Sequence, residues 1–340
     1  MPENIQVLIA LPTPVPEELI APVRQVSPRL QVTVRRAAAL AEVAADLAGA
    51  EVLLTALGLP EAAQAPRLRW VQAYSAGVDG WLEAGGDRLK DMALTTASGV
   101  HGPVMAEHSL MLMLAWAHLL PPMMALQQRH EWPAERWKML RTTELRGATL
   151  GIVGYGSIGR ETARLACAMS MRVLACKRDP QRREDAGWAV PSTGDPAGAL
   201  PDQYYAIEQL HEMLAECDYV LLTLALTPAT RHIIDAAALR HMKPSAVLVN
   251  VARGGLVDEP ALIDALRNGV IHAAGLDVFE KEPLPEDSPL WSLPNALLTP
   301  HMSGYTPAYE ERLVALFTEN LQRYLAGQRL LNQVDPAAGY

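Results

Sequence analysis

The strongest constraint on this chain is a glycine-rich turn at residues 154–159. Gly154, Gly156 and Gly159 follow the apolar stretch Thr149–Val153 and precede a segment with helical spacing. In a strand–turn–helix unit, the first glycine allows the tight turn, the second lets a ligand approach the backbone, and the third lets the helix pack closely on the strand. The free amides and partial positive charge at the start of such a helix suit a pyrophosphate.

This turn predicts a dinucleotide site, with a tight turn that holds no ligand as the alternative. The residues expected to contact the dinucleotide are Gly154, Tyr155, Gly156, Ser157, Ile158 and Gly159.

Apolar stretches of strand length alternate with longer helical patterns along the 340 residues. Such alternation predicts an α/β fold whose parallel sheets are covered by helices on both faces, and the length suits about two domains. The expected strands of the first series are Ile5–Ala10, Leu30–Val34, Val52–Thr55 and Trp70–Ala73. Those of the second series are Thr149–Val153, Arg172–Cys176, Tyr219–Leu224, Ala246–Val251, His272–Leu276 and Ala296–Leu298.

The glycine turn follows the first strand of the second series, so we expect the dinucleotide-binding domain to begin near residue 105. The segment Pro191–Gln203 is rich in Pro, Gly, Asp and Ala and is expected to form a surface insertion in that domain.

Composition and charge narrow the class of protein. A formal net charge of −9 argues against a nucleic-acid surface. Cys167, Cys176 and Cys217 form no CxxC pair, and their odd number favours a reduced, cytoplasmic setting with Cys167 and Cys176 in the core. The first twenty residues lack the pattern of a signal peptide. His108–Met124 is too short and too interrupted for a membrane span, so we expect a buried helix there.

The end of the strand Arg172–Cys176 bears on the choice of dinucleotide. An acidic residue about 20 positions past the glycines binds the ribose 2′-hydroxyl of NAD, whereas cations suit the 2′-phosphate of NADP. Lys177 and Arg178 come first after the strand and favour NADP. The alternative is that both are solvated charges and that Asp179 reaches back to the ribose of NAD.

Two charged side chains follow strands of the second series, at the sheet edge where α/β domains bind ligands. Arg253 comes just after Ala246–Val251, and its planar fork suits the carboxylate or carbonyl oxygen of a 2-keto acid, although a surface cation is the alternative. His301 comes just after Ala296–Leu298. A carboxylate from the segment after His272–Leu276 would complete an acid/base pair with this histidine.

With these motifs in order, the chain resembles the D-2-hydroxyacid dehydrogenase family over nearly its whole length. The resemblance rests on GYGSIG, NVARGGLVDEPAL, GLDVFEKEP and TPHMSG, and the first hundred residues match mainly through Tyr74–Asp79 and Ala106–His108. It implies two Rossmann-like domains. One is a discontinuous, flavodoxin-like substrate domain of residues 1–104 and 302–340, and the other is an inserted NAD(P)-binding domain of residues 105–301.

The resemblance also implies roles for individual residues. Arg253 would anchor and polarise a small 2-keto acid, His301 would protonate its oxygen as hydride reaches C2, and Glu282, rather than Glu280, would hold and tune the histidine. Asp277 would orient the nicotinamide or assist that network. Backbone amides that would take the substrate carboxylate belong to Ala76, Gly77 and Val78, where an ordinary glycine turn is the alternative. Further cofactor contacts are expected from Thr230, Val251, Ala252 and Gly304, and no metal site is expected.

Family dimers pair through a helix and loop that correspond to residues 130–139, so we expect a homodimer. Trp132, Arg136 and Trp137 would then border the partner's substrate pocket, unless they only pack on the dimer surface. Two positions depart from the family: Thr223–Thr227 replaces a common His-x-Pro-Leu-Thr, and His101 stands where asparagine is common.

Two alternative functions share these motifs. The first is a specialised relative such as a phosphite or formate dehydrogenase, although formate dehydrogenases carry glutamine at the position of Glu282. The second is a non-enzymatic NAD(P) sensor like the C-terminal-binding corepressors. An intact set of Arg253, Glu282 and His301 favours a reductase of acids such as glyoxylate or hydroxypyruvate.

Overall fold

The computed structural model describes residues 4–78, 80–81 and 92–335. These residues form two compact units. The first comprises Met1–Val100, Ala186–Val190 and Thr306–Tyr340, and the second comprises His101–Asp185 and Pro191–Tyr305. Asp79, which the sequence motif includes, lies outside the described residues.

The first unit is built on a five-stranded parallel sheet in the order β2-β1-β3-β4-β5. This 2-1-3-4-5 order is the flavodoxin-like one, as the family resemblance implied. Its strands are β1 (Ile5–Leu11), β2 (Leu30–Arg36), β3 (Val52–Thr55), β4 (Trp70–Ala73) and β5 (Ala93–Thr95). Its helices include α1 (Glu17–Gln25), α2 (Ala44–Leu47) and α11 (Tyr309–Leu325).

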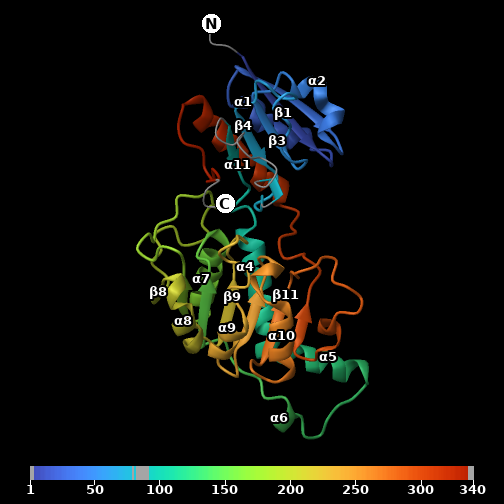
Figure 1. The fold of residues 1–340 in the computed structure, drawn as a ribbon, viewed down its shortest axis with the longest axis vertical. Coiled ribbons are helices and arrows are strands. Elements are labelled where there is room, and N and C mark those ends of the chain that lie inside the picture. Colours follow the sequence, from blue (N-terminus) through green and yellow to red (C-terminus); the bar gives the residue numbers. More distant parts are fainter. Residues whose placement is uncertain (1–3, 79, 82–91, 336–340) are drawn as a thin grey trace. The chain divides into compact units, whose positions relative to one another are not determined.

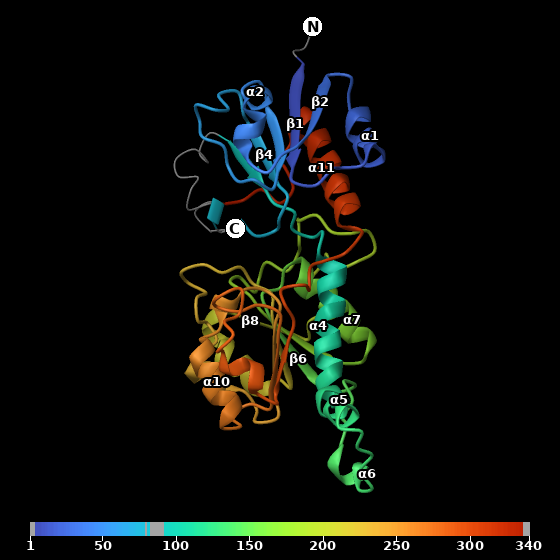
Figure 2. The ribbon, with the colours of Figure 1, turned by 90° about the vertical axis from the view of Figure 1, so that its right-hand side faces the viewer.

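Helices cover both faces of this sheet, as Figure 2 shows. α1 and α11 pack on one face, where Ile20 and Phe317 join the core with Ile9. α2 covers the other face through Leu47, which packs with Leu8. Neighbouring residues of β1 therefore enter different cores, because successive side chains of a strand point to opposite faces.

The second unit has a seven-stranded parallel sheet in the order β12-β11-β10-β9-β6-β7-β8. When the strands are numbered along the chain with β6 as the first, the six strands from β6 to β11 lie in the Rossmann order 3-2-1-4-5-6. The strands are β6 (Thr149–Val153), β7 (Arg172–Cys176), β8 (Gln203–Tyr205), β9 (Tyr219–Leu222), β10 (Val247–Asn250), β11 (Ala273–Leu276) and β12 (Ala296–Leu298).

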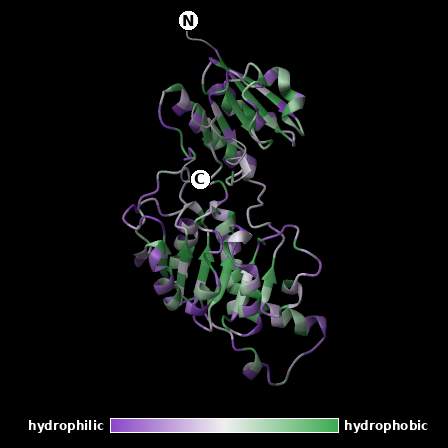
Figure 3. Cartoon of the chain, in the orientation of Figure 1, coloured by the Kyte–Doolittle hydropathy of each residue, from purple (hydrophilic) through white to green (hydrophobic). Residues whose placement is uncertain are grey.

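Two helix layers enclose this sheet (Figure 1). α4 (Gly102–Ala117) and α7 (Ser157–Ala168) pack on one face, where Leu112 and Ala163 belong to one buried cluster with Ile152 of β6. α8 (Leu210–Glu216), α9 (Ala236–His241) and α10 (Glu259–Arg267) pack on the other face. Both strand faces are buried, so the strands are continuously apolar, as the hydropathy colours of Figure 3 show.

The structure confirms the predicted α/β class and all ten expected strands, with shifts of one or two residues at some ends. It adds β5 and β8, which have only three residues each and leave little periodic signal. Cys176 and Cys217 are buried and Cys167 is half-buried, and all three are free thiols.

The prediction of one buried helix over His108–Met124 is right for α4 and wrong beyond it. The chain breaks at Leu119, which has a φ of 55°, and continues as α5 (Leu120–Gln128), which has no buried residue. Pro121 and Pro122 explain the break, because prolines are tolerated in the first turn of a helix but not in its interior. A short helix, α6 (Arg136–Met139), follows.

Among the described residues, no single helix has the length and composition of a membrane span. The bent pair α4 and α5, which meet at 67°, passes that test only when the two helices are taken together.

Candidate active site

Three neighbouring strands of the second unit end in the polar residues that the sequence singled out. β10, β11 and β12 lie side by side and parallel, and Arg253, Asp277 and His301 follow their carboxyl ends. The three side chains therefore leave the same edge of the sheet, which is where open α/β sheets bind their ligands.

His301 and Glu282 are in direct contact. Nδ1 of His301 lies 2.7 Å from Oε2 of Glu282, and the two side chains are 50% and 36% exposed. The other carboxylate oxygen, Oε1, accepts the amide of Phe279 at 3.0 Å, so Glu282 is itself held. Glu280, the other acidic residue of this motif, instead pairs with His232 on the surface. With Nδ1 directed at the carboxylate, Nε2 of His301 is the ring nitrogen left for a substrate.

Asp277 holds the loop that carries His301. It is fully buried, and its carboxylate accepts the amides of Met302 and Ser303, both at 2.9 Å. Its backbone carbonyl accepts the amide of His301 at 2.9 Å. His301 has a φ of 54°, in the left-handed region that a non-glycine residue adopts only when its surroundings impose it. These hydrogen bonds supply that constraint.

Arg253 is positioned by a close approach of two backbone segments. A Cβ at Gly254 would overlap the backbone of Phe279, so only glycine lets the turn after β10 lie against the turn after β11. Asn250 donates its side-chain amide to the carbonyl of Arg253 at 2.9 Å, and the guanidinium donates to the carbonyl of Ala252 at 2.8 Å.

The glycine turn between β6 and α7 has the shape that a dinucleotide requires. A Cβ at Gly154 would lie 2.7 Å from the amide nitrogen of Leu224, and one at Gly159 would lie 2.6 Å from the carbonyl oxygen of Gly154. A Cβ at Gly156 would meet nothing within 4 Å. Of the three motif glycines, only Gly156 faces open space, and this space lies at the N-terminus of α7. The turn therefore fits a pyrophosphate at that point.

The other predicted cofactor residues lie around this turn and along the same sheet edge. Ser157 and Ile158 begin α7, and Val251 and Ala252 are buried after β10. Thr230 uses its hydroxyl locally, donating to the carbonyl of Ala225 at 2.8 Å. The carbonyl of Gly304 lies 3.1 Å from Nδ1 of His101.

Tyr155, inside the motif, belongs to a second network that the sequence did not predict. Its hydroxyl donates to Oδ2 of Asp195 at 2.7 Å, and burial together with this carboxylate raises the pKa of Tyr155. The guanidinium carbon of Arg160 lies 4.8 Å from the centre of the tyrosine ring. Tyr155 is therefore a buried anchor for the segment around Asp195, and only its backbone is left for a phosphate.

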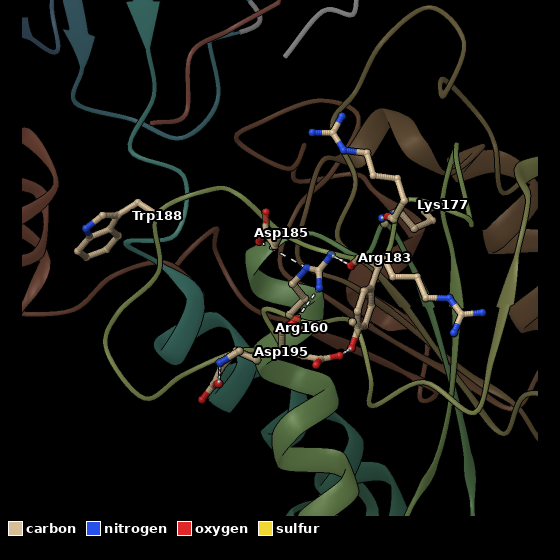
Figure 4. A network of polar contacts seen from close by, with 12 residues as sticks. Arg160, Lys177, Arg183, Asp185, Trp188 and Asp195 are labelled. Atoms are coloured by element: carbon tan, nitrogen blue, oxygen red, sulfur yellow. Dashed lines mark hydrogen bonds and ion pairs between the residues drawn. The ribbon is translucent and has the colours of Figure 1, made fainter. Parts of the chain in front are cut away.

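Arg160 ties the long segment between β7 and β8 to helix α7 (Figure 4). Its side chain is 3% exposed and donates to the carbonyls of Asp195 at 2.5 Å and Arg183 at 2.6 Å. Asp185 lies 3.4 Å from its Nε. The prediction of a surface insertion at Pro191–Gln203 is thus wrong for Asp195, which is 6% exposed. Its carboxylate accepts the hydroxyl of Tyr155 and the amides of Ala199 and Leu200.

The same segment contacts Lys177, the first of the two predicted cations. The ammonium group of Lys177 donates a hydrogen bond to the carbonyl of Arg182. Burial is the main cause that lowers the pKa of Lys177, and the nearby positive charge of Arg160 lowers it further. Arg178 is exposed. Residues 186–190 then belong to the first unit, where the side chain of Trp188 is buried in the core and its amide donates to Asn332 at 3.0 Å.

The predicted substrate loop follows β4 in the first unit. The hydroxyl of Ser75 donates to the carbonyl of Gly77 at 2.7 Å and tightens the turn. Among the described residues, the amides of Ala76 and Gly77 donate to no backbone acceptor. An anion would find donors there, which is the chemistry expected for a carboxylate.

The profile of the D-isomer specific 2-hydroxyacid dehydrogenase NAD binding domain matches residues 110–303. The chain belongs to this family.

Named relatives agree with that assignment. A glyoxylate/hydroxypyruvate reductase B of Pectobacterium atrosepticum is 36% identical over 273 residues, which are 80% of this chain and 80% of that protein. A D-3-phosphoglycerate dehydrogenase of Methanocaldococcus jannaschii is 33% identical over 80% of this chain, but the match spans only 48% of that longer protein.

A solved structure extends the likeness to the whole fold. The NADPH-dependent glyoxylate/hydroxypyruvate reductase of Sinorhizobium meliloti, in complex with NADP and sulfate, aligns with a TM-score of 0.77 and 27% identity. The alignment covers 99% of this chain and 100% of that one. The family member described here is accordingly an NAD(P)-dependent oxidoreductase with two Rossmann-like units.

Proposed function

We propose that this D-2-hydroxyacid dehydrogenase reduces a small 2-keto acid, such as glyoxylate or hydroxypyruvate, with NADPH. The observation that carries the proposal is the 2.7 Å contact between His301 and Glu282 on the sheet edge that also bears Arg253. An acid/base pair and an arginine are the groups that reduction of a keto acid requires.

The chemistry of the residues follows from their contacts. The bound nicotinamide supplies the hydride. Arg253 binds the carboxylate and carbonyl oxygens of the keto acid through its paired donors. His301 gives the proton on Nε2 to the C2 oxygen, while Glu282 keeps Nδ1 protonated and stabilises the imidazolium before transfer. The amides of Ala76, Gly77 and Val78 add donors for the substrate carboxylate.

Preference for NADP rests on the end of β7. Lys177 and Arg178 are cations at the position where an NAD enzyme carries an acid. The Sinorhizobium reductase, solved with NADP, is similar over the whole chain. The remaining predicted contacts, from Thr230, Val251, Ala252 and Gly304, complete the proposed cofactor site. Asp277, whose buried carboxylate binds Met302 and Ser303, assists the network around His301.

We further propose that the protein is a homodimer that pairs through the region of α5 and α6. Large apolar side chains are exposed there: Trp132 by 83%, Trp137 by 77% and Met124 by 49%. Arg136 lies 4.6 Å from the centre of the Trp137 ring. An exposed group of aromatic and methionine side chains is typical of an interface. The three free cysteines agree with the cytoplasmic setting that we propose.

A substrate panel with both cofactors tests the function. Glyoxylate, hydroxypyruvate, pyruvate and phenylpyruvate are each mixed with NADPH or NADH, and cofactor absorbance is followed. Phosphite and formate with oxidised cofactor are included for the alternative enzymes. We expect turnover of a keto acid with NADPH. No turnover in any arm would support a cofactor sensor instead, and equal efficiency with NADH would contradict the role of Lys177 and Arg178.

His301→Ala tests the catalytic assignment. We expect it to abolish turnover while NADPH still binds, because the proposal assigns the imidazole to the keto acid and not to the pyrophosphate. Retained turnover would contradict the proton-transfer role.

A further inference from the structure

His108, on helix α4, joins the hydrogen-bond network around Asp277 through its imidazole. Nε2 of His108 lies 3.1 Å from Oγ1 of Thr299. The same hydroxyl donates to Oδ1 of Asp277 at 2.5 Å. The side chain of His108 is 15% exposed and that of Asp277 is fully buried, so little water competes with these contacts.

The direction of these hydrogen bonds is determined by chemistry. A hydroxyl has one proton, and Thr299 directs it to a carboxylate that can only accept. The oxygen of Thr299 is therefore left to accept, and Nε2 of His108 must donate. Burial, the main influence, lowers the pKa of His108, which favours the neutral imidazole with its single proton. The chain of donors runs from α4 to Asp277.

This series of hydrogen bonds ends at the loop that carries His301, the proposed acid/base residue. Asp277 also accepts the amides of Met302 and Ser303, and its carbonyl accepts the amide of His301. A change in the position of the Asp277 carboxylate would therefore move the backbone directly after His301, at Met302 and Ser303. The left-handed conformation of His301 leaves this loop dependent on such support.

We propose that His108 is a positioning residue, which acts through Thr299 and Asp277 to hold the imidazole of His301 in the orientation that proton transfer needs. The inference rests on the proposed function, because it assigns the proton transfer to His301. His108 touches none of the reacting atoms. An apolar side chain would fill the same place among the buried residues of α4, such as Leu112 and Met113, so packing alone does not call for a histidine.

The test compares variants that remove or keep one hydrogen bond. His108→Leu and Thr299→Val remove it, and His108→Gln and Thr299→Ser keep a donor or hydroxyl. His118→Leu makes the same replacement at the exposed end of the same helix and serves as the control. For each protein, kcat and KM for glyoxylate are measured at saturating NADPH, and the Kd for NADPH is measured by fluorescence.

We expect His108→Leu and Thr299→Val to lower kcat by about ten- to a hundredfold, because a small misplacement of a catalytic group has effects of this size. KM and the NADPH Kd should stay within about threefold of wild type, since a loss confined to the transition state appears in kcat. His108→Gln and Thr299→Ser should recover most of the rate. The double variant His108→Leu/Thr299→Val should be no slower than the slower single variant, because both substitutions remove the same hydrogen-bond connection to Asp277.

Nitrogen NMR of the imidazole provides a readout without turnover. We expect the proton of neutral His108 on Nε2. A proton on Nδ1, a wild-type kcat in His108→Leu and Thr299→Val, or independent losses in the double variant would overturn the inference. If the wild type turns over its substrate and these variants do also, only the inference fails. If the wild type turns over no keto acid, the proposed function fails with it.

Discussion

Replacing Gly156 by alanine should stabilise the fold while it weakens cofactor binding. Gly156 has a φ of −96° and a ψ of −160°, an extended conformation that alanine adopts without strain. A Cβ there meets nothing within 4 Å. A compatible glycine-to-alanine change stabilises a protein by about 0.4–1 kcal/mol, because it restricts the unfolded chain. We therefore expect the free energy of unfolding of Gly156→Ala to rise by about that amount.

The same methyl group would occupy the space that we assign to the pyrophosphate. The phosphate oxygens would have to move away from the amides at the start of α7, and these charge-assisted hydrogen bonds would weaken. We expect the Kd for NADPH to rise by about tenfold or more, which corresponds to about 1.4 kcal/mol or more.

Gly159→Ala should instead lower the free energy of unfolding. Its Cβ would lie 2.6 Å from the carbonyl oxygen of Gly154 and 2.9 Å from Cγ2 of Ile152. Backbone and β-branched atoms cannot move aside easily, and overpacking of this kind costs about 1–3 kcal/mol. Gly49→Ala is a matched control in the first unit, because its Cβ would meet only the carbonyl oxygen of Asp46 at an ordinary 3.9 Å.

Urea unfolding without cofactor and fluorescence titration with NADPH measure the two effects separately. The expected pattern is higher stability with weaker binding for Gly156→Ala, lower stability for Gly159→Ala, and wild-type binding for Gly49→Ala. Wild-type affinity for NADPH in Gly156→Ala would refute the placement of the pyrophosphate at this glycine. Destabilisation of Gly156→Ala would show that the turn is closed where the structure has open space.

Three further changes test other parts of the structure. Gly254→Ala should abolish turnover because its Cβ overlaps the Phe279 backbone, whereas Gly255→Ala, which meets only flexible side chains, should keep most of it in the same assay. Asp195→Ala should lower the free energy of unfolding by about 2–4 kcal/mol, because it leaves the buried Tyr155 hydroxyl and the amides of Ala199 and Leu200 without this acceptor; an unchanged urea midpoint would contradict this. Burial lowers the pKa of His108 from its ordinary 6.5, so the unfolded state takes up the proton first as the pH falls. The stability advantage of wild type over His108→Gln should shrink as the pH falls through this value, and a constant difference between pH 7.5 and 5.5 would argue against a buried neutral imidazole.

Local patterns predicted the sheet edge well. Arg253, Asp277 and His301 each follow an apolar strand, and parallel strands bring their carboxyl ends to one edge whatever the details of packing. The choice of Glu282 over Glu280 came from resemblance to the family. Spacing alone leaves that choice open, because the two acidic residues are only two positions apart on an irregular loop, and the contact of Glu280 with His232 exists only in the folded chain.

Other residues gave no local signal. Arg160 and Asp195 are 35 positions apart, and a charged residue after a glycine turn or in a Pro/Gly-rich segment is usually solvated. Their burial depends on the path of the segment between β7 and β8, which few periodic positions constrain. His108 is similar, because the residues that it contacts, Thr299 and Asp277, lie far away in the sequence.

The sequence by itself determined the α/β class, most of the strands, the turn at Gly154–Gly159 and the polar residues Arg253, Asp277 and His301 after the strand ends. These depend on short-range periodicity and on the steric freedom of glycine, which act within a few residues. Only the tertiary structure decided which side chains join Tyr155 around Asp195, which carboxylate meets His301, and how Asp277 connects α4 to the His301 loop. Those contacts join residues from distant elements, and they form because buried polar groups must find partners once the two helix layers exclude water.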